Sequence, residues 1–197
     1  MSHSEAEGLQ NRKRRATAAR IAASAARLAA EHGLAAATID QIAHDAQVAR
    51  ATFFRYYDAK ESAVAEGITG PWLTLITETL TRQPAHLTAT QAISAAFTEL
   101  AAAFPPHYQQ IRELAQLTRS SATLDAWTLH AYRRYEHAIA EAITPRIPDH
   151  TDHDPRPRMT AALTMAAVRI SLDTWTAHGG SLPELIQHAL NTITIDT

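Results

Sequence analysis

Apolar residues along this chain recur at spacings of three and four, which is the period of an α-helix and not the alternation of a strand. Over residues 17–32 the pattern places Ile21, Ala25 and Leu28 on one face, and Gly33 follows as a stop. We find no convincing strand pairs and no internal repeat. The pattern therefore predicts an all-α protein.

Two short helices are predicted after this first one. Thr38 and Gln41 have the spacing of a capping box, in which each side chain satisfies a free amide at a helix start. From Ile39 onward, apolar residues at i, i+3, i+4 and i+7 predict a short amphipathic helix. After a break at Gln47, a third helix is predicted over residues 49–57.

The third helix is rich in aromatic residues, in the stretch "ARATFFRYYDAKE" at residues 49–61. Phe53 and Tyr57, at i and i+4, share one face and are predicted to be core. The other face carries Arg50, Thr52, Arg55 and Tyr56, with Phe54 at its edge. Such a face suits both an ordinary solvated helix and the DNA major groove, which admits a helix. Two short helices behind a supporting helix favour the second interpretation.

Residues 38–64, "TIDQIAHDAQVARATFFRYYDAKESAV", resemble the DNA-binding signature of the tetracycline-repressor (TetR) family of bacterial regulators. The shared pattern is a threonine cap, an Ile-Ala pair, a short turn, an aromatic run and Lys-Glu at the next helix start. The resemblance implies phosphate contacts from Thr38, Tyr56 and Lys60, and base-edge positions at Arg50, Ala51 and Thr52. The predicted DNA-binding residues are Thr38, Arg50, Ala51, Thr52, Phe54, Arg55, Tyr56 and Lys60.

Two positions depart from the family pattern. Gln47 stands where the turn usually has glycine, and Ala49 stands where the third helix usually has a serine or threonine cap. A left-handed conformation at Gln47 costs about 1–2 kcal/mol, and the missing cap oxygen costs about 1 kcal/mol more. We therefore expect a recognition helix that is locally loose in the free protein.

Further helices separated by prolines are predicted beyond residue 61, with a kink or restart near Pro71. The loop "PRIPDHTDHDPRPR" holds His150, His153 and three aspartates, but its prolines favour a solvated linker over a metal site. The predicted helices lie near residues 88–104, 107–119, 123–144, 159–177 and 181–193.

The last two helices predict self-association. Residues 159–177 are apolar on most sides, and a helix of this kind must be covered on all of them. The final helix has one clean apolar stripe. A two-helix surface that pairs with its copy matches the dimerisation mode of the TetR family. The predicted dimer interface comprises Leu182, Leu185, Ile186, Ala189 and Leu190.

The TetR resemblance also implies an effector pocket among the middle helices. "RELAQLTRSSATLDAW" and "RMTAALTMAAVRISLDTWTAHGGSLPELIQHAL" are similar to a subgroup of actinobacterial regulators that bind acyl-CoA-like ligands. The alternative at each position is ordinary core, and Arg169 is spaced to pair with Asp173. The candidate lining residues are Phe97, Phe104, Tyr108, Ile111, Arg112, Leu114, Trp127, His130, Met165 and Arg169.

Charge is distributed unevenly along the chain. Residues 1–60 hold nine Lys/Arg against six Asp/Glu, whereas the rest holds nine against fourteen. The run Arg12–Arg15 is either a solvated tail or an arm that contacts phosphate. We predict a disordered basic arm over residues 1–15, a helix-turn-helix domain over 16–62, and an effector-binding and dimerisation domain over 63–197.

Composition narrows the functional class. The chain has no cysteine, which fits a reducing interior and makes the cytoplasm the default. No apolar run is long enough to span a membrane, and no apolar segment follows the amino-terminal charges. No stretch matches Gly-x-Ser-x-Gly, His-Glu-x-x-His or a phosphate-binding loop. We expect no enzyme activity, no cofactor, no metal and no membrane partner.

The sequence therefore predicts a homodimeric repressor of about nine helices. Its expected partners are a palindromic double-stranded DNA operator and a small, largely apolar, acyl-CoA-like effector that releases the repressor from the operator. Two alternatives stay open, a helical enzyme and an interaction protein without a ligand on the same scaffold.

Overall fold

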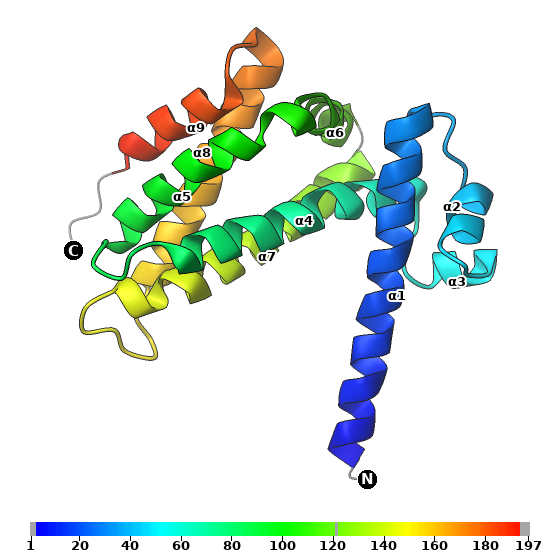
Figure 1. Ribbon diagram of the computed structural model, residues 1–197, viewed down its shortest axis with the longest axis horizontal. Coiled ribbons are helices and arrows are strands. Elements are labelled where there is room, and N and C mark those ends of the chain that lie inside the picture. Colours follow the sequence, from blue (N-terminus) through cyan, green and yellow to red (C-terminus); the bar gives the residue numbers. More distant parts are fainter. Residues whose placement is uncertain (1–2, 121, 194–197) are drawn as a thin grey trace. The chain divides into compact units, whose positions relative to one another are not determined.

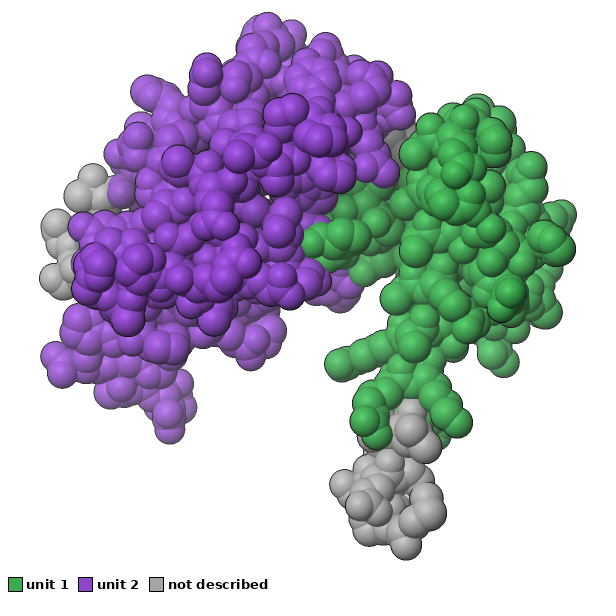
Figure 2. Space-filling view, in the orientation of Figure 1, with its two compact units in different colours: residues 1–71 green, residues 72–197 purple. Residues whose placement is uncertain are grey.

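The computed structural model describes residues 3–120 and 122–193, and these residues form nine α-helices, two short 3-10 turns and no strand (Figure 1). The predicted all-α class is confirmed. The chain divides into two compact units, residues 1–71 and 72–197 (Figure 2). This division lies inside a helix, whereas the sequence predicts a domain boundary after residue 62. No helix in the described ranges is long and apolar enough to cross a membrane.

The first unit contains α1 (His3–His32), α2 (Ile39–Asp45), α3 (Arg50–Phe54) and the first part of α4 (Lys60–Arg82). The structure differs from the disordered arm predicted over residues 1–15, because α1 already begins at His3. The sequence there consists mainly of good helix formers with a single glycine, Gly8, so nothing terminates the helix. The basic run is exposed along this part of α1.

Two other helices differ from their predicted spans. α3 ends at Phe54 instead of Tyr57, since the chain must turn before α4 begins at Lys60. α4 continues through Pro71, so of the two predicted outcomes, a kink or a restart, the restart is wrong. A proline inside a helix removes one backbone hydrogen bond, the one to the carbonyl of residue i−4, and the helix on both sides of Pro71 remains intact.

The core of the first unit contains apolar side chains from each of its first three helices. Ile21 of α1, Ile42 of α2 and Phe53 of α3 have no exposed surface. Gly67 of α4 lies directly against α1, where an added Cβ would stand 2.1 Å from the Ala22 carbonyl oxygen. Only glycine permits this approach of the two helix backbones.

The second unit contains the remainder of α4 and five further helices: α5 (Ala89–Ala103), α6 (Tyr108–Ser120), α7 (Ala122–Ile143), α8 (Arg156–His178) and α9 (Leu182–Asn191). The 3-10 turns Pro105–His107 and Thr144–Arg146 stand where prolines predicted breaks. α8 packs on α7 and α9, and α9 packs on α5 (Figure 1). The helices predicted from periodicity are therefore present, with ends shifted by a few residues.

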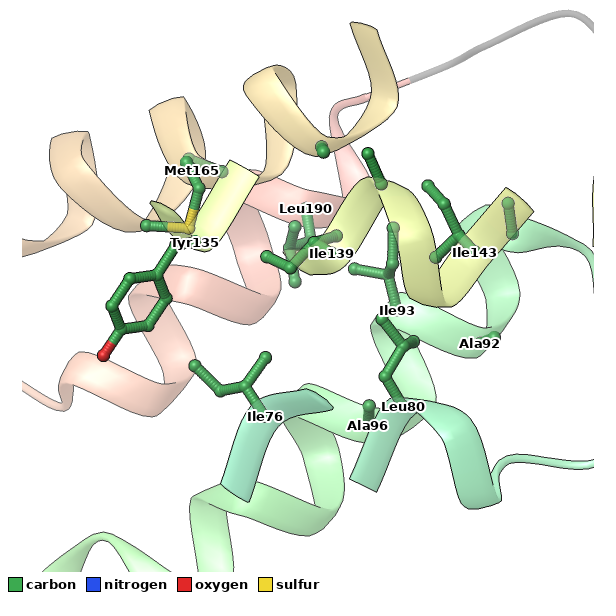
Figure 3. Packing of buried hydrophobic residues seen from close by; sticks show 14 of the residues in the cluster. Ile76, Leu80, Ala92, Ile93, Ala96, Tyr135, Ile139, Ile143, Met165 and Leu190 are labelled. Atoms are coloured by element: carbon green, nitrogen blue, oxygen red, sulfur yellow. The ribbon is translucent and has the colours of Figure 1, made fainter. Parts of the chain in front are cut away.

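Side chains from five helices meet in the main core of the second unit (Figure 3). Fully or nearly fully buried members come from each: Ile76 and Leu80 of α4, Ile93 of α5, Ile139 and Ile143 of α7, Met165 of α8, and Leu190 of α9. Burying each of these side chains contributes about 1.5–3 kcal/mol of transfer free energy. This cluster holds helices that are distant in sequence.

Charged side chains secure the loops around this core. Arg146 donates to the carbonyls of Gln83 (2.6 Å) and Pro84 (2.7 Å), which joins the end of α4 to the loop after α7. Asp154 accepts from the Arg156 side chain and backbone amide, and these bonds lower the pKa of Asp154. Its carboxylate is therefore committed to the start of α8.

Candidate DNA-binding surface and effector region

The start of α2 has the predicted capping box. The Thr38 amide donates to Gln41 Oε1 at 2.9 Å, and the Gln41 amide donates to Thr38 Oγ1 at 3.3 Å. Arg27 of α1 forms an ion pair with Asp45 at the other end of α2. Hydrogen bonds from Arg27 and then Ser24 lower the pKa of Asp45. Both ends of the short helix are thus held.

The turn between α2 and α3 contains both departures noted in the sequence. Gln47 has φ of 53°, so a left-handed residue is needed here and glutamine takes that role. Ala49 is the N-cap of α3 and makes no side-chain capping bond. These two geometric predictions are confirmed, whereas local looseness of α3 stays a prediction.

Of the two aromatic residues predicted to be core, Phe53 is buried, whereas Tyr57 lies beyond the end of α3 and is half-buried because its hydroxyl reaches the surface of α1. Phe53 is fully buried, and its ring lies 5.5 Å edge-on from Phe54 and 6.0 Å from Tyr57, measured between ring centroids. The Tyr57 hydroxyl donates to the Ala18 carbonyl of α1 at 3.1 Å. The orientation of α3 is therefore set by its buried face.

The opposite side of α3 is presented to solvent. Ala51 and Arg55 are exposed, Thr52 and Tyr56 are half-buried, and Phe54 is 46% exposed. Because α3 ends at Phe54, Arg55 and Tyr56 lie in the turn that follows it. The structure thus brings the predicted base-edge positions together on the first turn of a short helix, which is where recognition helices contact bases.

Arg50 has a partner that the sequence interpretation missed. Its Nη1 donates to Asp40 Oδ1 of α2 at 2.6 Å, and its guanidinium carbon lies 5.6 Å from the centroid of the Phe54 ring. The sequence signal for this partner was Asp40, an acidic residue in the first turn of α2. Acidic residues are common there because they stabilise the helix dipole, so Asp40 did not by itself indicate a pair with Arg50.

Lys60 is engaged within the protein. Its Nζ donates to the carbonyls of Leu34 (2.8 Å), Ala35 (3.2 Å) and Ala37 (2.7 Å), all in the loop between α1 and α2. A lysine ammonium has three donors, so these bonds use its full capacity. A phosphate contact from Lys60 requires at least one of them to break.

Three of the predicted effector residues lie together in the second unit. Phe104, Tyr108 and Ile111 surround Trp175, which is fully buried and was not predicted. The Tyr108 and Trp175 ring centroids are 4.9 Å apart, and the indole N–H donates to the Gly180 carbonyl at 3.1 Å.

Arg112 borders this aromatic cluster. It donates to the Tyr108 hydroxyl at 2.9 Å, and its guanidinium carbon lies 5.8 Å from the Trp175 ring centroid. The half-buried guanidinium is therefore a cation beside an apolar group of rings.

The other predicted pocket residues are dispersed. Met165 is buried in the main core, and Phe97 packs against this core. Leu114 and Trp127 are half-buried, and His130 is exposed. Arg169 is exposed and pairs with Asp173 at 3.6 Å, which was the alternative reading. A shallow depression of about 350 Å³ on α4 is lined by none of these residues, but by Thr77, Glu78, Thr81 and Arg82.

The apolar surface available to a partner lies on α8 more than on α9. Leu182 and Leu190 of α9 are buried within the chain, and Leu185, Ile186 and Ala189 pack partly against its cores. The predicted interface stays a prediction, and its side chains have contacts within their own chain. Met159, Leu163 and Ile170 of α8 are 58%, 42% and 53% exposed and share one helix face.

Two family models match the sequence. Residues 21–66 match the one described as bacterial regulatory proteins, tetR family, and residues 87–196 match the one described as the MftR C-terminal domain. The second match alone spans more than half of the chain. The search of curated proteins found no match to the chain.

Solved structures share the fold. FadR of Thermus thermophilus, a TetR-family transcriptional repressor in complex with lauroyl-CoA, has a TM-score of 0.65 at 19% identity, covering 90% of this chain and 96% of that one. A TetR transcriptional regulator from Rhodococcus sp. RHA1 has a TM-score of 0.65 at 16% identity, covering 91% and 96%. FadR of Bacillus subtilis in complex with stearoyl-CoA has 0.54 at 17% identity, covering 87% and 95%.

Proposed function

The chain belongs to the TetR family of bacterial transcriptional regulators, and from this premise we propose that it is a homodimeric repressor released from its operator by an acyl-CoA-like effector. The family matches point to a DNA-binding regulator rather than an enzyme. The observation that carries the proposal is the exposed first turn of α3, held in place by the buried Phe53.

We assign operator binding to α3 and the residues flanking it. Arg50, Ala51 and Thr52 stand at the helix start, where base edges are read in helix-turn-helix proteins. Phe54, Arg55 and Tyr56 follow on the same exposed side, and Thr38 begins α2. We assign Lys60 a supporting role, because its ammonium is bonded to three carbonyls of the protein.

Dimerisation is assigned to the exposed stripe of α8. Met159, Leu163 and Ile170 leave apolar surface uncovered on a helix whose opposite face is packed. The occupant that we propose is the same stripe of a second copy, with the exposed edge of α9 beside it. A two-fold dimer places two recognition helices about 34 Å apart, in successive major grooves of a palindrome.

The effector is assigned to the second unit. Two structures that share the fold hold acyl-CoAs, and the ring cluster around Trp175 combines apolar surface with the Arg112 cation. We propose that an acyl chain packs among these helices and that Arg112 contacts the anionic head. Such a ligand weakens operator binding by the ratio of its affinities for the free and DNA-bound states.

The test is a fluorescence anisotropy titration of the protein onto its own upstream intergenic DNA and onto a scrambled duplex, at several salt concentrations. We expect binding about a thousandfold tighter to the specific site, with two protomers or a multiple of two per site. Leu163→Asp should lower both dimerisation and operator affinity, whereas Leu129→Asp on α7, also an exposed leucine, is the matched control.

Addition of acyl-CoAs of increasing chain length should release the operator, with free CoA as the control. A selection from random duplexes covers operators located elsewhere in the genome. Failure of the wild-type protein to enrich any palindrome would contradict the repressor proposal. Palindrome enrichment without release by any acyl-CoA would contradict only the effector assignment.

A further inference from the structure

Arg50 and Asp40 form the one ion pair, among the described residues, that joins α2 to α3. The bond is 2.6 Å long, and the two side chains are 56% and 71% exposed. The Phe54 ring, one turn along α3, lies 5.6 Å from the guanidinium carbon. The guanidinium is thus located by a carboxylate from the neighbouring helix and by an aromatic ring from its own.

A carboxylate at this place is unfavourable for DNA binding in general. Phosphate oxygens dominate the attraction of DNA to proteins, and Asp40 adds negative charge next to the proposed reading surface. Stabilisation of the α2 dipole by an acid in the first turn is small at an exposed site. If Asp40 acts by holding Arg50, the first residue of α3, the position of its carboxylate within hydrogen-bonding distance of Arg50 is explained.

Guanine is the base that an oriented arginine recognises. Its O6 and N7 acceptors in the major groove match two parallel N–H donors of a guanidinium. The guanidinium has five N–H donors, and the bond to Asp40 uses one of them on Nη1. The Nε and Nη2 edge retains the paired donors that guanine requires. A side chain already fixed in place also loses less rotamer freedom when it binds.

We propose that Asp40 is a specificity-determining residue, which positions Arg50 to read one guanine in each operator half-site and reduces the attraction of Arg50 for phosphates elsewhere. This inference rests on the proposed operator binding by α3. Asp40 acts through Arg50 and makes no base contact of its own.

The experiment is a parallel selection from a random duplex library with four full-length proteins: wild type, Asp40→Asn, Arg50→Ala and Asp58→Asn. Asparagine keeps the size of Asp40 and removes its charge. Asp58 is an exposed acid in the turn before α4, so Asp58→Asn makes the same change of net charge outside the α2–α3 pair. Circular dichroism and thermal unfolding verify that each variant is folded.

We expect wild type and Asp58→Asn to enrich a palindrome with an invariant guanine at one position of each half-site. Asp40→Asn should enrich the same palindrome with about tenfold weaker preference at that position, and Arg50→Ala should lose the preference there. Replacing this guanine by 7-deazaguanine should weaken wild-type binding and leave Arg50→Ala unaffected. A fifth protein, the double variant Asp40→Asn/Arg50→Ala, should behave as Arg50→Ala does, because Asp40 has no effect without its partner.

Asp40→Asn should also bind scrambled DNA a few-fold more tightly at low salt than Asp58→Asn does. An unchanged guanine preference in Asp40→Asn would overturn the inference and leave the acid as a helix-start residue. Loss of a cytosine preference in Asp40→Asn that Arg50→Ala retains would also overturn it, since the carboxylate would then contact a base directly. Absence of any wild-type palindrome would instead defeat the repressor proposal on which the inference rests.

Discussion

The two units of this protein differ in how their functional residues are assembled. In residues 1–71 the candidate reading surface is formed by short helices that begin and end at local signals, and α3 is oriented by a single fully buried side chain, Phe53. In residues 72–197 the longer helices meet in a core to which five of them contribute, and the predicted pocket residues are divided among that core, an aromatic cluster and the surface.

This difference has a physical origin. A reading surface is an exposed face, so its residues follow from helix periodicity once the buried face is known. A pocket is the space that several packed helices leave between them, and it depends on every crossing angle and side-chain volume in the core. A change in one side chain can therefore affect the second unit broadly, whereas the first unit depends on a few specific positions.

Trp175→Ala is expected to have the largest effect and to act on the second unit. The indole is fully buried among Phe104 and Tyr108, and its removal should destabilise the unit by about 3–5 kcal/mol. Denaturant unfolding followed by circular dichroism measures the loss. Trp175→Phe, which retains a ring but not the N–H bond to Gly180, should lose less; equal losses would contradict the packing argument.

Gly67→Ala is expected to damage the first unit in a comparable way. The new Cβ would stand 2.1 Å from the Ala22 carbonyl oxygen, so α1 and α4 must separate, at a cost of about 1–3 kcal/mol or more. Thermal unfolding and operator titration should both detect it. Gly70→Ala is the matched control on the same helix, since its Cβ would meet only Glu66 Oε1 at 3.8 Å, and it should stabilise by about 0.5–1 kcal/mol.

Lys60→Met distinguishes support of the reading surface from contact with DNA. It removes three hydrogen bonds from the α1–α2 loop, and we expect a loss of about 2 kcal/mol in unfolding free energy. Operator affinity should fall while its dependence on salt concentration stays the same.

Arg55→Ala, at an exposed position, should change the salt dependence of operator binding and not the stability. Its stability should be nearly unchanged, and its salt slope should fall by about one unit. If Lys60→Met instead reduces the slope without loss of stability, Lys60 contacts phosphate directly.

Gln47→Gly should have a smaller effect on stability than Trp175→Ala or Gly67→Ala, and it should stabilise the protein where those variants destabilise it. Glycine removes the strain of φ at 53°, and the variant should be more stable by about 1 kcal/mol. Amide hydrogen exchange over residues 47–52 should slow. Exchange in the wild-type protein that is already as slow there as in α1 would refute the expected looseness of α3.

Ala49→Ser, which supplies a cap oxygen, is an independent change with a similar expected gain in stability.

Several features of the reading surface were predictable from a few residues at a time. The Thr38 capping box, the left-handed Gln47, the uncapped Ala49 and the burial of Phe53 all appear in the structure. Each depends on residues within one or two helical turns. The resemblance added the assignment of α3 to DNA, which stays a proposal; the family match over residues 21–66 shows the family.

The effector region was less predictable because its members are distant in sequence. Arg112 and the three residues around Trp175 were named as candidates, but Trp175 itself was not. His130 and Arg169 were named on residue type and proved exposed, since an amphipathic pattern does not specify which neighbour covers each face. The outward stripe of α8 likewise required knowledge of which faces α7 and α9 cover.

The sequence by itself determined the helical class, the approximate helix spans and the face of α3 that is buried, because these depend on propensity, caps and periodicity over short separations. Only the tertiary structure decided which partners the charged and small residues meet. Lys60 reaches carbonyls more than twenty residues away, and Gly67 admits the backbone of α1. The Asp40–Arg50 pair exists because the Gln47 turn brings α2 and α3 together. Contacts of this kind depend on how the core places the helices relative to one another, so no local pattern encodes them.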